Sequence, residues 1–135
     1  MARVIVDTSV LIRLVTGEPA DQASRARRAL EAAAEAGEEI VIHPLVLSEM
    51  VFVLNGPRLR IPRDEQVQAV ELVMDIGSAP EDHKWLKRAL DWYRDSGVGW
   101  LDCLLGSYAA EAAEGNVLTF DSDFARLPGL NSRIP

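Results

Sequence analysis

Short apolar runs rich in β-branched residues alternate with longer amphipathic segments along this chain. The runs Val4–Val6, Glu39–Ile42 and Asn116–Phe120 predict β-strands, because such residues pack well on a pleated surface. Two further short strands are expected at Gly77–Pro80, on a sheet edge, and at Ser132–Ile134. The sequence therefore predicts several short strands spread over its whole length.

The segments between these strands repeat apolar residues at helical spacing or consist of strong helix formers. They predict helices at Val10–Val15, Asp21–Ala36, Pro44–Leu54, Arg63–Ile76, Glu81–Ser96 and Trp100–Glu114, with a turn or short helix at Asp121–Phe124. Strands separated by helices pair in parallel through right-handed crossovers. We therefore expect one α/β domain spanning residues 1–135.

The composition is that of an ordinary globular chain of 135 residues, with 48% hydrophobic and 26% charged residues. Charges interrupt every apolar run well short of the roughly 20 residues that a membrane-spanning helix needs. The single cysteine, Cys103, excludes an internal disulfide and is expected to be a buried packing residue. With no signal-peptide pattern at the N-terminus, we expect a cytoplasmic protein.

The formal net charge of −7 argues against wholesale electrostatic binding of nucleic acid, but local binding stays open. The basic residues are mostly arginines, and two groups of them stand close together in the sequence: Arg25, Arg27 and Arg28, and Arg58, Arg60 and Arg63. Solvated helix or loop positions are the favoured interpretation of both groups. Contact with phosphate, which the planar guanidinium suits, is the alternative.

Four carboxylates stand within or directly after apolar segments, namely Asp7, Glu49, Asp102 and Asp121. An ionised carboxylate in apolar surroundings is costly unless a cation or hydrogen-bond donors compensate it. A shared divalent metal would compensate all four. Asp7 and Asp121 each end a predicted strand, and the carboxyl ends of parallel strands meet at one edge of a sheet. Near Asp102, Gly106 leaves space either for an ion or for a close helix contact.

An all-oxygen set of ligands suits Mg²⁺ or Mn²⁺, and such a site is fitted to phosphodiester hydrolysis. The two histidines, His43 and His83, argue against a zinc site, and His43 is expected either to cap a helix or to satisfy a hydrogen bond in the core. Each acid also has an ordinary structural interpretation. Asp7 and Asp121 can cap strand ends, Glu49 can pair with an arginine, and Asp102 can favour a helix N-terminus.

The acids lie in four ordered stretches, VIVDTSVLIRL, LSEMVF, GWLDCLLGSYA and VLTFDSDFARLPGL. Together these resemble the PIN domain and, more narrowly, the VapC-type toxin ribonuclease of a type II toxin–antitoxin pair. The resemblance covers nearly the whole chain. It implies a single PIN domain over residues 1–135 with a three-layer fold, in which helices flank a central parallel sheet of about four to five strands. It also implies a Mg²⁺-dependent endoribonuclease, with Mn²⁺ as an alternative cofactor.

The resemblance carries the catalytic, metal-binding positions of the family onto the four carboxylates: Asp7, Glu49, Asp102 and Asp121. It matches supporting positions to Ser9, Thr119 and Asp123. In this hypothesis, the first three acids organise one metal, and Asp121 orients a second metal or the attacking water. The hydroxyls of Ser9 and Thr119 would fix carboxylate rotamers.

Partners follow from the same resemblance. Such toxins usually form homodimers and cleave structured RNA, chiefly tRNA or ribosomal RNA. A VapB-like antitoxin silences them by placing its C-terminal segment, often with an arginine, in the acidic groove. A guanidinium can replace the charge of a metal among carboxylates.

Three other functions compete with the toxin. The chain can be a PIN-fold RNA-processing or DNA nuclease without an antitoxin, or a non-catalytic acidic module that binds a basic peptide. A signalling receiver domain also gathers acids and Mg²⁺ at strand ends. It needs a lysine after a late strand, whereas both lysines here, Lys84 and Lys87, lie in one predicted helix.

Overall fold

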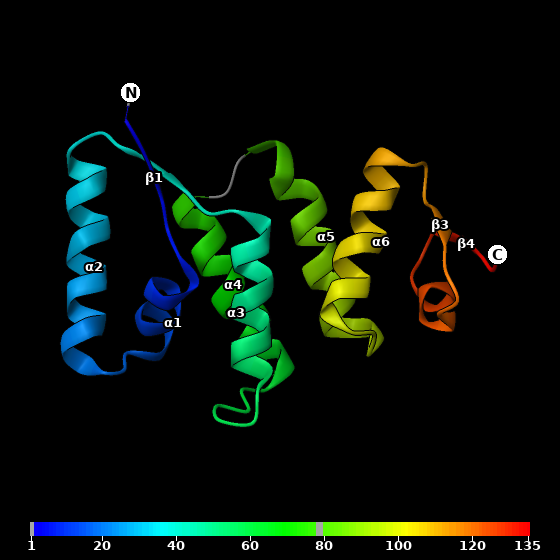
Figure 1. Ribbon diagram of the computed structural model, residues 1–135, viewed down its shortest axis with the longest axis horizontal. Helices are drawn as coiled ribbons and strands as arrows, with labels where there is room; N and C mark the ends of the chain where they lie inside the picture. Colours follow the sequence, from blue (N-terminus) through cyan, green and yellow to red (C-terminus); the bar gives the residue numbers. More distant parts are fainter. Residues whose placement is uncertain (1, 78–79) are drawn as a thin grey trace. The chain divides into compact units, whose positions relative to one another are not determined.

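The computed structural model describes residues 2–77 and 80–135, which fall into two compact units, Met1–Ala79 and Pro80–Pro135. The first unit contains β1 (Arg3–Ile5), α1 (Thr8–Thr16), α2 (Ala20–Glu35), β2 (Glu39–Val41), α3 (Pro44–Asn55) and α4 (Arg63–Gly77). The second contains α5 (Pro80–Ser96), α6 (Trp100–Ala112), β3 (Asn116–Leu118), the 3₁₀ helix η1 (Ser122–Arg126) and β4 (Asn131–Arg133). Figure 1 shows the structure with colours that follow the sequence, from blue at the N-terminus to red at the C-terminus.

In the first unit, β1 and β2 pair in parallel, with Val4 opposite Ile40. Helix α1 packs against both α2 and α3, and α3 packs against α4. The core is made of aliphatic side chains that are almost completely buried: Leu11, Leu47, Met50, Leu54, Val70 and Val73. His43 begins α3 by accepting a hydrogen bond from the backbone N–H of Leu45 at 3.0 Å, which confirms its predicted capping role. Helix α1, which Asp7 caps, and α3, which carries Glu49 near its middle, are thereby attached to one core.

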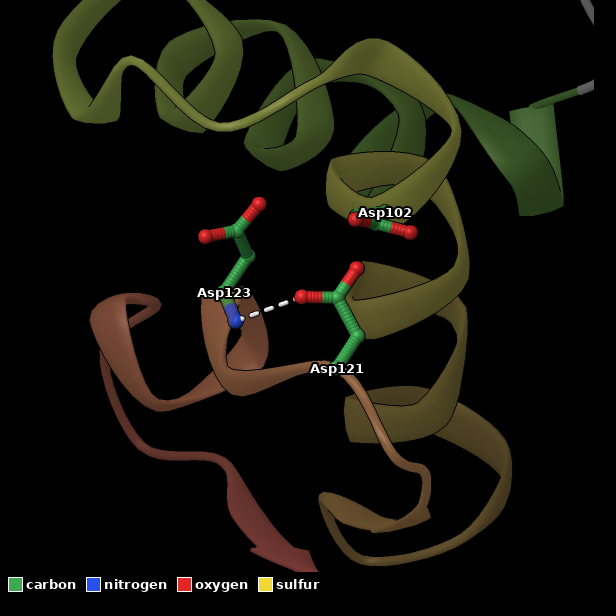
Figure 2. A group of neighbouring side chains, drawn as sticks. All are labelled: Asp102, Asp121 and Asp123. Carbon is green, nitrogen blue, oxygen red and sulfur yellow. Dashed lines mark hydrogen bonds between the residues drawn. The ribbon is translucent and has the colours of Figure 1, made fainter.

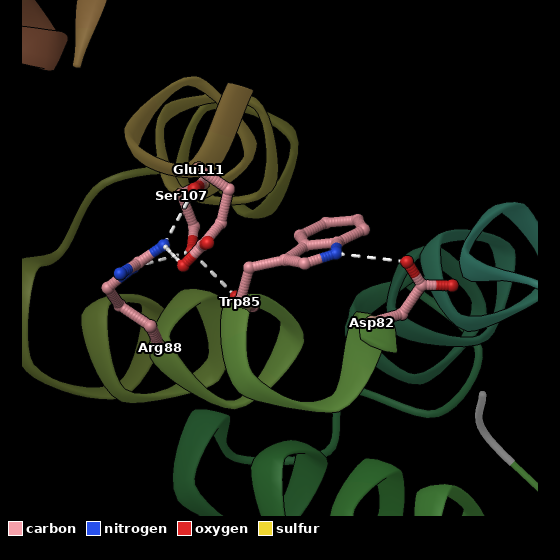
Figure 3. Close-up of polar contacts among 5 residues, drawn as sticks. All are labelled: Asp82, Trp85, Arg88, Ser107 and Glu111. Atoms are coloured by element: carbon pink, nitrogen blue, oxygen red, sulfur yellow. Dashed lines mark hydrogen bonds and ion pairs between the residues drawn. The ribbon is translucent and has the colours of Figure 1, made fainter. Parts of the chain in front are cut away.

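In the second unit, α5 and α6 form an antiparallel hairpin next to the parallel pair β3 and β4 (Figure 1). A polar network joins the two helices (Figure 3). The Arg88 guanidinium donates to the Ser107 hydroxyl and to the Ser107 carbonyl, both at 2.9 Å, and it reaches Glu111 at the same distance. The Ser107 hydroxyl in turn donates to the Trp85 carbonyl at 2.6 Å. Because these bonds link α5 to α6, they fix the helix that carries Asp102.

Gly106 allows a close approach in the same unit. A methyl group on its Cα would lie 2.7 Å from a side-chain carbon of Leu130 and 3.1 Å from one of Leu127. The space at Gly106 is therefore filled by the segment after η1 and is not open to an ion, and the expected close contact is made by this segment rather than by a helix. Cys103 is fully buried, which confirms its predicted packing role.

The sequence predicts the order of elements well. Every predicted helix and four of the predicted strands are present, with bounds shifted by a few residues. Of the edge strand expected at Gly77–Pro80, Gly77 ends α4 and Pro80 begins α5, while residues 78–79 lie outside the described part of the chain. Within the described ranges, no helix is long and apolar enough to cross a membrane.

The fold class is confirmed in part. The described chain combines helices with parallel strands, as an α/β fold does, but it is mostly helical and each strand has three residues. The strands form two separate pairs, β1 with β2 and β3 with β4. A continuous sheet of four to five strands is not confirmed, because the two pairs belong to different units of the described chain.

Candidate metal centre

Asp7 lies between β1 and α1 and is the N-cap residue of α1. Its Oδ2 atom accepts hydrogen bonds from the Ser9 hydroxyl at 2.8 Å and from the Ser9 backbone N–H at 3.4 Å. The hydrogen bond from the Ser9 side chain lowers the pKa of Asp7 below its ordinary value, and the backbone N–H groups of Ser9 and Thr8 lower it further. Asp7 is therefore a fixed, ionised carboxylate, which suits both a helix cap and a metal ligand.

Glu49 lies on α3 and contacts the start of α1. The buried Thr8 hydroxyl donates to Glu49 Oε2 at 2.9 Å, so the residue directly after Asp7 holds the second acid. No arginine or lysine of residues 2–77 and 80–135 forms an ion pair with Glu49, so the structure does not support the ion-pair interpretation. Thr8 was not among the residues predicted to support the site, although its hydroxyl directly after Asp7 was a signal for such a role.

Three acids meet in the second unit, as Figure 2 shows. Asp102 comes from the first turn of α6, Asp121 follows β3, and Asp123 lies in η1. One oxygen from each carboxylate lies within 4.8 Å of the corresponding oxygens of the other two. Asp123, expected to have a supporting role, is thus as close to the group as the two predicted ligands.

Hydrogen bonds from backbone N–H groups to side-chain oxygens hold the loop that carries Asp121 and Asp123. The Asp121 carboxylate accepts the Asp123 N–H at 2.8 Å, which makes Asp121 the cap of η1 (Figure 2). The Thr119 hydroxyl accepts the Asp121 N–H at 2.9 Å. Thr119 was expected to fix a carboxylate rotamer, but it holds the backbone of Asp121 instead. The reason is geometric, since a hydroxyl two residues before an N–H readily closes a local turn.

The three carboxylates repel one another. Partial burial raises the pKa of Asp102 above its ordinary value, and the nearby carboxylates of Asp121 and Asp123 raise it further. Arg126 offers limited compensation, because its guanidinium lies 3.7 Å from Asp123 and both side chains are about half exposed. A donor set of three carboxylates, with no sulfur or imidazole in it, fits a hard divalent cation such as Mg²⁺ or Mn²⁺.

The apolar surroundings expected for all four predicted ligands are found only in part. Asp102 is half-buried, whereas Asp7, Glu49 and Asp121 are exposed, so only Asp102 is even partly removed from solvent. On α3 the cause is visible: the apolar neighbours Leu45 and Phe52 are themselves 69% and 61% exposed. Apolar neighbours in sequence therefore did not imply an apolar environment for Glu49.

The predicted ligands thus fall into two sets. Asp7 and Glu49 belong to the first unit, joined through Thr8 and Ser9. Asp102, Asp121 and Asp123 belong to the second unit, where they form the acidic cluster. That all of them act as one centre stays a prediction.

Comparison with known proteins identifies the family. The family model of the PIN domain matches residues 4–130, which include every acid described above. A search of curated proteins finds no match to the chain. PIN domains are typically nucleases, and they usually use Mg²⁺ or Mn²⁺. Because the match covers nearly the whole sequence, the chain belongs to the PIN domain family.

Proposed function

We propose that this protein is a Mg²⁺-dependent endoribonuclease that acts as the toxin of a type II toxin–antitoxin pair. The observation that carries the proposal is the cluster of Asp102, Asp121 and Asp123 in a chain of the PIN family. Membership supports a nuclease, and a carboxylate cluster is the kind of site that nucleases use to bind divalent metal. The four ordered motifs support the narrower assignment to the toxins.

In the proposed reaction, Asp7, Glu49, Asp102 and Asp121 act as one catalytic and metal-binding centre. A bound Mg²⁺ or Mn²⁺ would supply a better nucleophile from water and charge stabilisation for the leaving oxygen. The residues of the chain set the geometry for this chemistry. Ser9 holds the Asp7 carboxylate and Thr8 holds the Glu49 carboxylate, so neither has to be ordered when substrate arrives.

The partners belong to the same proposal. The substrate is RNA, and the toxin forms a homodimer whose activity a VapB-like antitoxin blocks with its C-terminal segment. An arginine of that segment would enter the acidic groove and neutralise the carboxylates in place of metal. The net charge of −7 favours a basic partner peptide of this kind.

The test separates the proposal from its alternatives. Purified protein is incubated with tRNA, ribosomal RNA, single-stranded RNA and DNA oligonucleotides, in Mg²⁺, Mn²⁺ or EDTA, and new 5′ ends are mapped. We expect cleavage of structured RNA at defined positions, abolished by EDTA. Cleavage confined to DNA would favour a DNA nuclease, and metal binding without cleavage of any substrate would favour the non-catalytic module.

A second measurement addresses the toxin role itself. Expression of the chain alone should arrest growth of a bacterial host, and expression of an Asp102→Asn variant should not. Asp75→Asn is the matched control, because Asp75 is an exposed acid on α4 and the change removes the same charge. Normal growth with the wild-type chain, at equal protein level, would contradict the toxin assignment.

A further inference from the structure

Two hollows in the first unit share one arginine. The first, of about 480 Å³, lies between α1 and α2 and is lined by Ser9, Arg13 and Arg25 among others. The second, of about 710 Å³, is lined by Arg13, the turn between α1 and α2, and Arg58 from the loop after α3. Arg25 and Arg58, which are distant in sequence, therefore line two hollows that have Arg13 in common.

Arg13 has a fixed orientation. Its Nε atom donates to the side-chain carbonyl of Gln22 on α2, and Nη1 donates to the Ser9 backbone carbonyl at 2.9 Å. These bonds leave other N–H groups of the guanidinium for a ligand. An arginine held in place before binding loses less conformational entropy when it contacts a phosphate.

Arg25 and Arg58 are the two arginines of the hollows that have no partner among residues 2–77 and 80–135. Both are exposed, and within residues 2–77 and 80–135 neither takes part in a hydrogen bond or an ion pair. The other arginines of α2 differ, since Arg27 lies 4.0 Å from Glu31 and Arg28 donates to the Ser24 carbonyl at 3.4 Å. Two side chains that line hollows are thus free to contact an anion.

The first hollow begins beside Asp7, the predicted ligand at the start of α1. Ser9 lines the first hollow, and its hydroxyl is the group that donates to Asp7 at 2.8 Å. A polymer whose reacting phosphate lies at Asp7 would place neighbouring phosphates near Ser9 and the arginines. One acid, Glu18, also lines the second hollow and reduces its positive potential. Two arginines, Arg13 and Arg58, line the same hollow and outnumber it.

We propose that Arg13, Arg25 and Arg58 form a phosphate-binding track that holds the RNA backbone next to the cleavage site. The proposal rests on the proposed function, because the track has this use only if the acids cleave RNA. Through these arginines, a chain of net charge −7 would bind a polyanion locally. Guanidinium groups bind phosphate bidentately, and contacts to phosphate carry no sequence information, so the track adds affinity and register without sequence preference.

The test measures RNA binding without cleavage. Full-length protein in EDTA is titrated with a labelled single-stranded RNA of about 15 nucleotides over a series of salt concentrations. Arg25→Gln and Arg58→Gln should each weaken binding about fivefold to tenfold at low salt, and each should reduce the slope of log K against log salt by about 0.7. Arg27→Gln is the matched control, since it removes the same charge from α2 outside both hollows.

Cleavage assays separate this proposal from the nuclease itself. With Mg²⁺, Arg25→Gln and Arg58→Gln should raise KM for long RNA and leave kcat unchanged, whereas a substrate of two or three nucleotides should be cleaved as by wild type. If both variants bind and cleave long RNA like Arg27→Gln, the track is refuted while the nuclease stands. If wild type cleaves nothing, the proposed function fails, and with it the stated use of the track, whatever the binding data show.

Discussion

The two sets of acids differ in how their charge is compensated. In the first unit, the two predicted ligands each have their own hydroxyl donor, Ser9 for Asp7 and Thr8 for Glu49. In the second unit, three carboxylates crowd together, and the pKa of Asp102 is raised by burial and by its acidic neighbours. The hydroxyl donors compensate the charge of the first set without a cation, whereas a cation would relieve the repulsion among the carboxylates of the second set. The comparison therefore predicts that metal, if the protein binds it as proposed, is held mainly by the second unit.

The largest expected effect comes from removing a charge in either set. Asp102→Asn and Asp7→Asn should each reduce RNA cleavage about 10³-fold or more, because each removes a proposed metal ligand while leaving a side chain of the same size. Cleavage rates with excess RNA measure the loss, and circular dichroism checks the fold. The comparison predicts that Asp102→Asn also abolishes metal binding in calorimetry, whereas Asp7→Asn only weakens it.

Asp75→Asn is again the control and should retain full activity. Full cleavage by a folded Asp7→Asn protein would remove Asp7 from the centre. Equal loss of metal affinity in both variants would break the distinction between the two sets.

Metal should stabilise the protein through the second unit. At a concentration of Mg²⁺ about 100 times its dissociation constant, the free energy of unfolding should rise by about 2.7 kcal/mol. Asp102→Asn should lose this gain. In EDTA, the same variant should be at least as stable as wild type, because the change relieves repulsion from Asp121 and Asp123. Chemical denaturation with and without Mg²⁺ measures both quantities, and a metal-free Asp102→Asn protein less stable than wild type would argue against the repulsion.

The hydroxyl contact in the first unit should have a smaller effect on activity. Thr8→Val keeps the shape of the side chain but removes the donor to Glu49, so cleavage should fall about 10-fold to 100-fold, as for other groups that orient metal ligands. Thr8→Ser should restore most of the rate. Thr16→Val, on the same helix, removes a hydroxyl that donates to the Ile12 carbonyl and should leave cleavage unchanged. If Thr8→Val cleaves RNA as fast as Thr16→Val, the contact between Thr8 and Glu49 does not contribute to cleavage.

The smallest expected effect is a change of stability with pH. Asp7 has a native pKa below its ordinary 3.8, so its contribution to stability is lost as the pH falls through that lowered value. Asp102 has a native pKa above 3.8, so it makes the metal-free fold less stable as the pH rises from about 3.8 through that raised value. The two acids thus act in opposite directions, on opposite sides of pH 3.8.

Denaturant unfolding in EDTA across this pH range measures the contrast. Asp102→Asn should flatten the decrease above pH 3.8, and Asp7→Asn should flatten the rise below it. Addition of Mg²⁺ at higher pH should oppose the decrease in wild type, because the cation neutralises the same carboxylates. An unchanged profile in Asp102→Asn would show that the acidic cluster does not destabilise the fold.

Much of this architecture could be predicted from the sequence. Helical spacing of apolar residues fixed the positions of the helices, and the ends of the apolar runs marked Asp7 and Asp121 as candidates. Short-range chemistry was also legible, since the bond from Ser9 to Asp7 spans two residues. The family match covers residues 4–130, a range that contains all four motifs.

Other features depend on contacts between residues far apart in the chain. The bond between Thr8 and Glu49 joins positions 41 residues apart, and no local pattern encodes it. The inclusion of Asp123 in the acidic cluster depends on how η1 lies against α6. The exposure of Glu49 could not be inferred, because a helix rich in apolar residues all round has no face that the sequence marks as buried.

The tight fit at Gly106 has a consequence for how such a centre tolerates mutation. This position carries no oxygen, yet it sets how near the segment with Leu127 and Leu130 can come to α6. The same segment follows directly after the loop that bears Asp121 and Asp123. A single added methyl group would therefore act as a spacer between acids that it never touches. An inventory of ligands alone would overlook this position.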